Sequence, residues 1–136
     1  MMDTEGKSSP GCVLIVDDEE ILRKVSSETL TRIGYRVLTA ADGLEAVKLF
    51  GECAEEIDIV VLDMIMPRMN GVDCLECLRG IDPNIPVVLC SGYIVDAMDA
   101  EKSKFTTFLK KPYRAVKLRK IVEETLASCD RERNRG

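Results

Sequence analysis

The chain has 136 residues, of which 46% are apolar and 32% are charged, a size and balance typical of a single folded domain. Its formal net charge of −5 argues against general nucleic-acid binding through a basic face. The sequence contains no histidine, which excludes a Ser–His–Asp triad, histidine metal ligands and a phosphohistidine of its own.

The two ends differ in composition from the rest of the chain. Residues 1–10 combine Gly, Ser and Pro with mixed charges and are expected to form a flexible leader, and residues 130–136 are expected to form a polar tail. Residues 11–129 then make up one domain, because no internal repeat or long linker divides them.

Short apolar runs alternate with longer amphipathic segments along this domain, which indicates alternating strands and helices. In the helix expected over 19–33, one face at helical spacing is formed by Leu22, Val25, Thr29, Leu30 and Ile33. Gly34 suits the left-handed position just past a helix end, and Asp42 followed by Glu45 indicates a capping box that opens the next helix. In chain order, the expected elements are strand 12–16, helix 19–33, strand 35–39, helix 42–54, strand 58–62, helix 72–79, strand 86–90, helix 94–103, strand 106–109 and helix 114–128.

The pattern of the strands predicts an α/β fold. Strands 12–16, 58–62 and 86–90 are nearly continuous apolar runs, as expected for parallel strands that helices cover on both faces. Right-handed crossovers then give a doubly wound sheet. We therefore expect a flavodoxin-like, five-stranded parallel sheet of order 2-1-3-4-5 with five helices.

The six cysteines are expected to be reduced thiols. The N-terminus lacks the apolar core of a secretory signal, and no apolar run approaches the roughly 20 residues of a membrane span. A cytoplasmic domain without a membrane partner is therefore expected. Cys74 and Cys77 form a C-x-x-C pair, which we interpret as two neighbours on one helix because no further cysteine or histidine ligands stand nearby.

Charged and hydroxyl side chains follow four of the five predicted strands. Because the carboxyl ends of parallel strands lie at one edge of a sheet, order 2-1-3-4-5 gathers these residues around one crevice. The residues at these strand ends are Asp17 and Asp18, Asp63, Ser91, and the pair Lys110 and Lys111.

Three carboxylates in one small crevice repel each other and need a cation. A lysine supplies one positive charge, and Mg²⁺, which prefers carboxylate, phosphate and water oxygens, supplies the rest; Mn²⁺ is an expected substitute. A carboxylate can attack phosphorus to form an aspartyl phosphate, and phosphoryl transfer depends mainly on positioning and charge neutralisation. The chemistry therefore needs no histidine in this chain.

Four segments together resemble the receiver domains of two-component response regulators, of the chemotaxis-regulator kind. The resemblance runs over about residues 11–128, and its S-G-Y triplet is similar to receivers attached to hybrid histidine kinases. The segments are LIVDDEE (14–20), VVLDMIMPRMNG (60–71), PVVLCSGY (86–93) and FLKKPY (108–113).

The resemblance implies a role for each residue of the crevice. Asp63 matches the phosphoacceptor, and Asp17 and Asp18 match the acidic pair that binds Mg²⁺. The backbone carbonyl of Ile65 matches the third protein ligand of the metal. Lys111 matches the lysine that pairs with the phosphoryl group, whereas its neighbour Lys110 does not.

The resemblance also implies a conformational switch. Ser91 matches the hydroxyl that moves toward the phosphoryl group, and Phe108 matches the aromatic residue that changes rotamer. The peptide bond before Pro112 is expected to be cis. The surface expected to switch, and to offer a site for homodimers, is formed by helix 94–103, strand 106–109 and helix 114–128.

The implied partner is a histidine kinase or a histidine phosphotransfer domain, without nucleic-acid binding through this domain. The chain is expected to assist its own aspartyl phosphorylation and dephosphorylation without being an enzyme in the ordinary sense. Ile65 and Tyr93 occupy the positions that tune hydrolysis in the family, and both are bulky. We therefore expect slow self-dephosphorylation. Whether the chain acts alone or belongs to a larger kinase stays open.

Three other functions compete with this interpretation. A phosphatase of the haloacid-dehalogenase kind would need an Asp-x-Asp after the first strand, but Asp17 and Asp18 are adjacent. A flavodoxin-like binding module would need a Ser/Thr/Gly-rich phosphate loop there, where this chain has acidic residues. A degenerate receiver that only binds proteins is disfavoured because all the key side chains are present.

Overall fold

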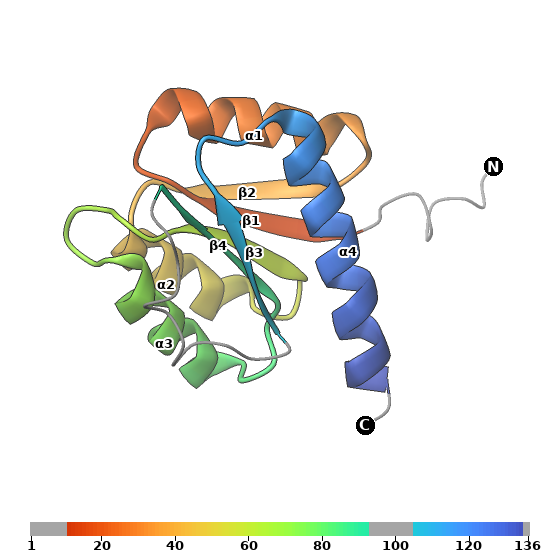
Figure 1. Ribbon diagram of the computed structural model, residues 1–136. Helices are drawn as coiled ribbons and strands as arrows, with labels where there is room; N and C mark the ends of the chain where they lie inside the picture. The colour runs from red at the N-terminus through yellow and green to blue at the C-terminus, as the bar shows by residue number, and fades with distance from the viewer. Residues whose placement is uncertain (1–10, 93–104, 135–136) are drawn as a thin grey trace.

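Five short segments form the strands of one parallel sheet in the computed structural model, which describes residues 11–92 and 105–134 (Figure 1). The spatial order is β2-β1-β3-β4-β5, so the order expected from the sequence is confirmed. The strands are β1 (Cys12–Val16), β2 (Arg36–Ala40), β3 (Ile59–Asp63), β4 (Val87–Ser91) and β5 (Thr106–Lys110).

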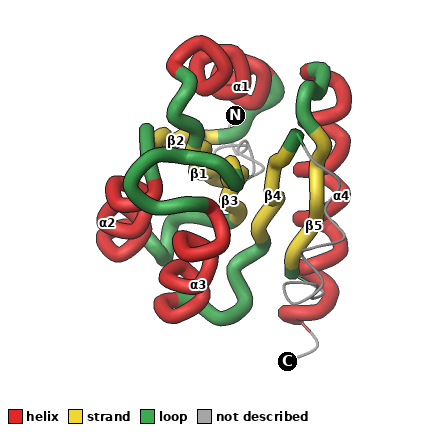
Figure 2. Tube along the Cα trace, turned by 60° about the vertical axis from the view of Figure 1, so that its left-hand side comes forward, coloured by secondary structure: helices red, strands yellow, loops and turns green. Residues whose placement is uncertain are grey.

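Helices cover both faces of the sheet, with α2 and α3 on one side and α1 and α4 on the other (Figures 1 and 2). The expected helix over 94–103 lies outside the described residues, which contain four helices where five were expected for the whole chain. These helices are α1 (Glu20–Arg32), α2 (Gly43–Cys53), α3 (Gly71–Ile81) and α4 (Ala115–Asn134).

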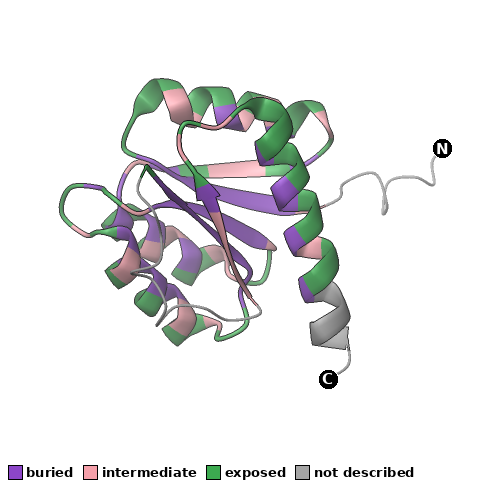
Figure 3. Cartoon of the chain, viewed as in Figure 1, coloured by how far each residue is buried: buried purple, intermediate pink, exposed green. Residues whose placement is uncertain are grey.

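Each face of the sheet packs against its own hydrophobic core, which explains why β1, β3 and β4 are apolar at consecutive positions. Leu14 and Leu62 pack with Phe50 under α2 and α3. Ile15 and Val61 belong to the core under α1 and α4. Figure 3 shows the central strands β1, β3 and β4 as the buried centre of the molecule, with the edge strands β2 and β5 more exposed. Because successive side chains of a strand point to opposite faces, a strand buried on both sides loses the alternation of a surface strand.

Local signals place the helix ends where the sequence predicts them. The Asp42 carboxylate accepts a hydrogen bond from the Glu45 amide at 2.8 Å, and the Glu45 carboxylate accepts one from the Ala41 amide at 2.7 Å. This is the predicted capping box. Asn70 caps α3 in the same way, by accepting from the Asp73 amide at 2.9 Å.

Two helices differ from the expectation. Val25 was expected on the buried face of α1 but is 50% exposed, and the adjacent Ser26 is buried instead. The last helix was expected to end at Ser128, but α4 continues to Asn134 because no Gly or Pro interrupts the sequence there.

All six cysteines are free thiols, and Cys74 and Cys77 lie on α3, the first buried and the second exposed. None of the described helices combines the length and apolar character needed to cross a membrane.

Candidate functional site

The carboxyl ends of the strands bring the predicted polar residues to one edge of the sheet. Asp17 directly follows β1, Asp63 ends β3, Ser91 ends β4 and Lys111 directly follows β5. Asp17, Asp63 and Ser91 are buried, with exposed fractions of 4%, 6% and 2%. Asp18 is exposed at the rim. The three parallel pairings that join β1, β3, β4 and β5 therefore bring these residues to the same edge of the sheet, as the sequence predicted.

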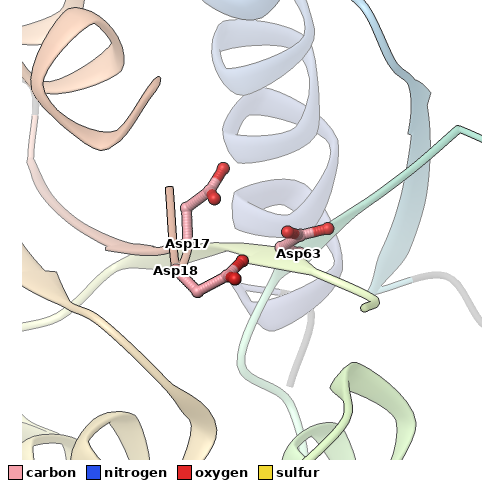
Figure 4. A group of neighbouring side chains, drawn as sticks. All are labelled: Asp17, Asp18 and Asp63. Atoms are coloured by element: carbon pink, nitrogen blue, oxygen red, sulfur yellow. The ribbon is translucent and has the colours of Figure 1, made fainter. Parts of the chain in front are cut away.

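The three aspartates form a compact acidic cluster (Figure 4). One carboxylate oxygen from each of Asp17, Asp18 and Asp63 lies within 4.8 Å of the others. Three oxygen donors at this spacing match the ligands that hard divalent cations prefer, and Mg²⁺ commonly uses a few carboxylates together with water and phosphate oxygens. The donor set therefore fits the ion that the sequence predicted.

Lys111 supplies positive charge at the centre of this cluster. Its Nζ lies 3.2 Å from Asp63 Oδ2 and 3.4 Å from Asp17 Oδ2. It also lies 3.8 Å from Glu19 Oε1, a fourth carboxylate that was not predicted as a site residue. Three carboxylates thus lie within 4 Å of one ammonium group, and Asp18 adds a fourth to the cluster, so the site carries more negative than positive charge and can accept a divalent cation. The neighbouring Lys110 is exposed.

The protonation states of Asp63 and Lys111 are coupled. Burial raises the pKa of the Asp63 carboxyl group; the Lys111 ammonium opposes this rise, and the Asp17 carboxylate adds to it. Burial alone would lower the pKa of Lys111, but the attraction of Asp63 and Asp17 outweighs it, so that pKa is raised. Lys111 therefore stays charged at neutral pH, while the buried Asp63 carboxylate is destabilised in the absence of further positive charge.

A surface depression of about 500 Å³ lies over Asp63. Asp63 and Lys111 are accessible from it despite their burial, and Ser91 borders it at the end of β4. Ile65 also borders it, and its amide lies 3.4 Å from Asp63 Oδ1. The depression has the volume for a phosphoryl group and its donor side chain beside the carboxylate.

Two predicted residues stand at the edge of this arrangement. Phe108 is half-buried in β5 beside Leu89 of β4 and packs against the core under α2 and α3. The peptide bond between Lys111 and Pro112 is cis, as the resemblance implied.

Sequence reasoning missed the residues of α1 that support the site. Arg23 Nη1 donates to the backbone carbonyl of Asp17 at 2.6 Å. The hydroxyl groups of Ser26 and Tyr113 lie 3.2 Å apart, so the residue after Pro112 is joined to α1. Helical spacing of apolar residues places Leu30 on the inward face of α1, but it does not identify the polar side chains on that face that have a partner.

Comparison with known proteins agrees with this geometry. The family model described as response regulator receiver domain matches residues 13–123. The chain is 38% identical to the sensor kinase CckA of Brucella abortus over 90% of this chain and 13% of the kinase. It is also 38% identical to the chemotaxis protein CheY of Thermotoga maritima over 75% of this chain and 86% of that protein.

Solved structures show the same fold. The receiver domain of the hybrid histidine kinase CckA superposes with a TM-score of 0.75 and 37% identity, over 85% of this chain and 99% of that one. A chain of the CheX–CheY–BeF3–Mg²⁺ complex of Borrelia burgdorferi gives a TM-score of 0.80 and 33% identity, over 88% and 91%. Sequence, fold and the arrangement of strand-end residues thus agree, and the chain belongs to the response regulator receiver domain family of two-component signalling.

Proposed function

We propose that Asp63 accepts a phosphoryl group from a phosphohistidine of a partner histidine kinase or histidine phosphotransfer domain. The observation that carries the proposal is the position of Asp63 at the floor of an open depression, with its carboxylate 3.2 Å from the Lys111 ammonium. The carboxylate is accessible from the depression, and the Lys111 ammonium can neutralise the negative charge of an arriving phosphoryl group. The 136 residues contain no histidine, so the phosphohistidine comes from outside them.

The transfer step is a displacement at phosphorus. An Asp63 carboxylate oxygen attacks, a P–O bond forms, and the P–N bond to the partner's imidazole breaks with its electron pair going to nitrogen. Lys111 is 3.2 Å from Asp63 Oδ2 and neutralises negative charge on the transferred group. The hydroxyl of Ser91 can donate a hydrogen bond to a phosphoryl oxygen from the wall of the depression.

Asp17, Asp18 and Asp63 would hold Mg²⁺, with the backbone carbonyl of Ile65 as the further protein ligand that the family resemblance implies. A bound Mg²⁺ supplies electrostatic stabilisation of the phosphoryl oxygens. Mn²⁺ accepts the same oxygen donors and is expected to replace it. Asp17 contributes buried negative charge next to the acceptor, so the same residue that binds a cation would repel the phosphoryl group without one.

The domain would act as a phosphoacceptor and not as an enzyme in the ordinary sense, because Asp63 is itself modified in each cycle. Phosphorylation would draw Ser91 toward the phosphoryl group and move Phe108 into the vacated space. β5 and α4 would carry this change to the surface of the domain, where the resemblance also implies a homodimer face. The expected helix over 94–103, which the resemblance assigns to the same face, lies outside the described residues. Six free thiols suit a reducing compartment, so we place the reaction in the cytoplasm.

To test this, wild-type protein and Asp63→Asn are each incubated with acetyl phosphate or a phosphohistidine donor, with and without Mg²⁺, and their masses are compared. The proposal expects intact-mass spectrometry to show one added phosphoryl group in the wild type with Mg²⁺ only, and none in Asp63→Asn. Equal labelling of both proteins would contradict the proposal, and so would labelling of the wild type that occurs when Mg²⁺ is chelated before the donor is added. Steady turnover of small phosphate esters would instead favour a phosphatase.

A further inference from the structure

The loop between β3 and α3 carries Ile65 beside the acceptor and is closed at its base. The Gly71 amide donates to the Met64 carbonyl at 2.7 Å. The two backbones are so close that a Cβ on Gly71 would lie 2.5 Å from Met64 Cα and 2.7 Å from the Asp63 carbonyl oxygen. The base of the loop is therefore fixed, and its remaining freedom lies at its tip.

The tip of this loop is a tight turn centred on Arg68. The Met69 amide donates to the Pro67 carbonyl at 2.7 Å, and Arg68 between them has a φ of 71°. Three-residue turns with a positive φ at the centre are rare and strained for residues other than glycine. Such a conformation persists when contacts outside the turn hold it in place.

The contact that holds the tip is an ion pair between Arg68 and Asp42. Asp42 is buried, and its other carboxylate oxygen caps α2 through the Glu45 amide. The tip also packs on α2 next to this pair, because Met69 fills the space in which a Cβ on Gly43 would lie. Asp42 thus anchors the loop to a helix end that is itself fixed by the capping box.

The same helix end is connected to the opposite side of the acidic cluster. The Asp17 amide donates to the Ala40 carbonyl at 3.2 Å, and Ala40 ends β2 two positions before Asp42. A short path therefore runs from Asp17 through the end of β2 to Asp42 and Arg68, and from there to the loop that carries Ile65. Neither Arg68 nor Asp42 borders the depression over Asp63.

We propose that Arg68 and Asp42 are positioning residues that hold the β3–α3 loop at its spacing from Asp17 and thereby set the affinity of the site for Mg²⁺. This inference rests on the proposed function, because it assumes that the acidic cluster binds the metal. Loss of the ion pair leaves the three carboxylates of the acidic cluster and Lys111 present, but lets the loop that carries the Ile65 carbonyl relax. Metal binding therefore weakens, while the phosphoryl-accepting group is unchanged.

The test uses Arg68→Ala, Arg68→Lys, Asp42→Asn and the double variant Arg68→Ala/Asp42→Asn. Asparagine caps helices as well as aspartate, so Asp42→Asn removes the charge and keeps the cap. NMR titration with Mg²⁺ gives the dissociation constant directly, and phosphorylation by acetyl phosphate gives the rate at saturating Mg²⁺. Thermal unfolding verifies that each variant is folded.

We expect Arg68→Ala and Asp42→Asn each to raise the Mg²⁺ dissociation constant about fivefold, less than the loss typical of groups that contact a metal ligand directly. The double variant should resemble either single variant because both remove one interaction. Arg68→Lys should restore part of the affinity, and the rate at saturating Mg²⁺ should stay within about twofold of the wild type in all variants.

Arg36→Ala is the matched control, because the Arg36 side chain is 59% exposed and pairs with Glu56, while that of Arg68 is 64% exposed and pairs with Asp42. It should leave Mg²⁺ affinity unchanged. A wild-type protein that accepts phosphoryl groups, together with unchanged affinity in Arg68→Ala and Asp42→Asn, would overturn this inference alone. A wild-type protein that binds no Mg²⁺ would overturn the proposed function and this inference with it.

Discussion

The hydroxyl of Tyr113 lies 3.2 Å from the hydroxyl of Ser26, which is 87 positions away in the chain. Ser26 is buried in α1, and Tyr113 packs against the core under α1 and α4. Lys111 stands two residues before Tyr113, so this contact holds the segment that presents the ammonium group to Asp63. Burial raises the pKa of Tyr113 to about 12, so the phenol stays neutral under physiological conditions.

Tyr113→Phe should destabilise the domain by about 1 kcal/mol, because it removes one hydrogen bond and leaves the Ser26 hydroxyl with a lost partner. Urea unfolding of the wild type, Tyr113→Phe, Ser26→Ala and the double variant measures the coupling between the two hydroxyls. Additive effects of the two single substitutions would show that the hydroxyls do not interact. Folded Tyr113→Phe is also expected to be phosphorylated at Asp63 more slowly than the wild type, since the segment that carries Lys111 is less constrained.

Asp63→Asn should make the metal-free protein more stable at neutral pH. The pKa of Asp63 is raised by burial, so the folded state binds this proton more tightly than the unfolded state does. Its contribution to stability is present below the ordinary pKa of 3.8 and is lost as the pH rises through the folded pKa. The ionised carboxylate therefore destabilises the fold at neutral pH, and the amide relieves this.

Urea unfolding at neutral pH and near pH 4 measures the effect of Asp63→Asn. The stability difference between the variant and the wild type should shrink as the pH falls. Mg²⁺ should raise the stability of the wild type more than that of the variant, because an ion that binds only the folded state stabilises it by mass action. A less stable Asp63→Asn at neutral pH would mean that the Lys111 ion pair outweighs the cost of burial.

The site was predictable from the sequence where it depends on strand ends. Parallel pairing brings the ends of strands together whatever side chains lie between them, so Asp17, Asp63 and Ser91 follow from the strand order alone. Strand order also predicts a lysine there, but the choice of Lys111 over Lys110 came from the family resemblance. The core followed in the same way from the apolar runs of β1, β3 and β4.

The missed features are contacts between polar side chains that are distant in sequence. Arg68 and Asp42 are 26 positions apart, and nothing in either local sequence selects the partner. Val25 was expected on the buried face of α1 because it is apolar. Ser26 is buried there instead, and its hydroxyl lies within hydrogen-bond distance of the Tyr113 hydroxyl. Hydrophobic periodicity reports only which side chains are apolar. It cannot identify a polar side chain that is buried because its hydroxyl has a hydrogen-bond partner.

Gly71→Ala and Gly51→Ala should change stability in opposite directions. A Cβ on Gly71 would lie 2.5 Å from Met64 Cα, and backbone atoms cannot move aside as a flexible side chain can. We expect a loss of about 1–3 kcal/mol, as for other overpacked positions. A Cβ on Gly51, within α2, meets nothing within 4 Å, so alanine should add up to about 1 kcal/mol through helix propensity.

Thermal and urea unfolding of the wild type and both glycine variants shows whether each substitution raises or lowers the free energy of unfolding. Gly71→Ala should also weaken Mg²⁺ binding, since the closed base of the β3–α3 loop must open to admit the methyl group. Equal stability of the two variants would contradict the close approach of Gly71 to Met64.

Ile65→Asn should accelerate loss of the phosphoryl group from Asp63. Ile65 is 59% exposed and borders the depression, so its side chain stands where water approaches the acceptor but offers no group to orient that water. Tyr93, the second position expected to tune hydrolysis, lies outside the described residues. An asparagine amide can hydrogen-bond the attacking water without accepting its proton, so we expect an acceleration of about tenfold, below the roughly hundredfold typical of a positioned proton-transfer group.

The measurement follows loss of phosphate from purified, phosphorylated protein after removal of the donor. Ile81→Asn is the matched control, because Ile81 is also an exposed isoleucine, 43% accessible, but ends α3 and does not border the depression. It should leave the rate of dephosphorylation unchanged. If Ile65→Asn lost phosphate more slowly than the wild type, the side chain at this position would assist hydrolysis, and slow self-dephosphorylation would need another cause. An acceleration confined to Ile65→Asn would locate the control of signal lifetime in the same loop that Arg68 anchors to α2.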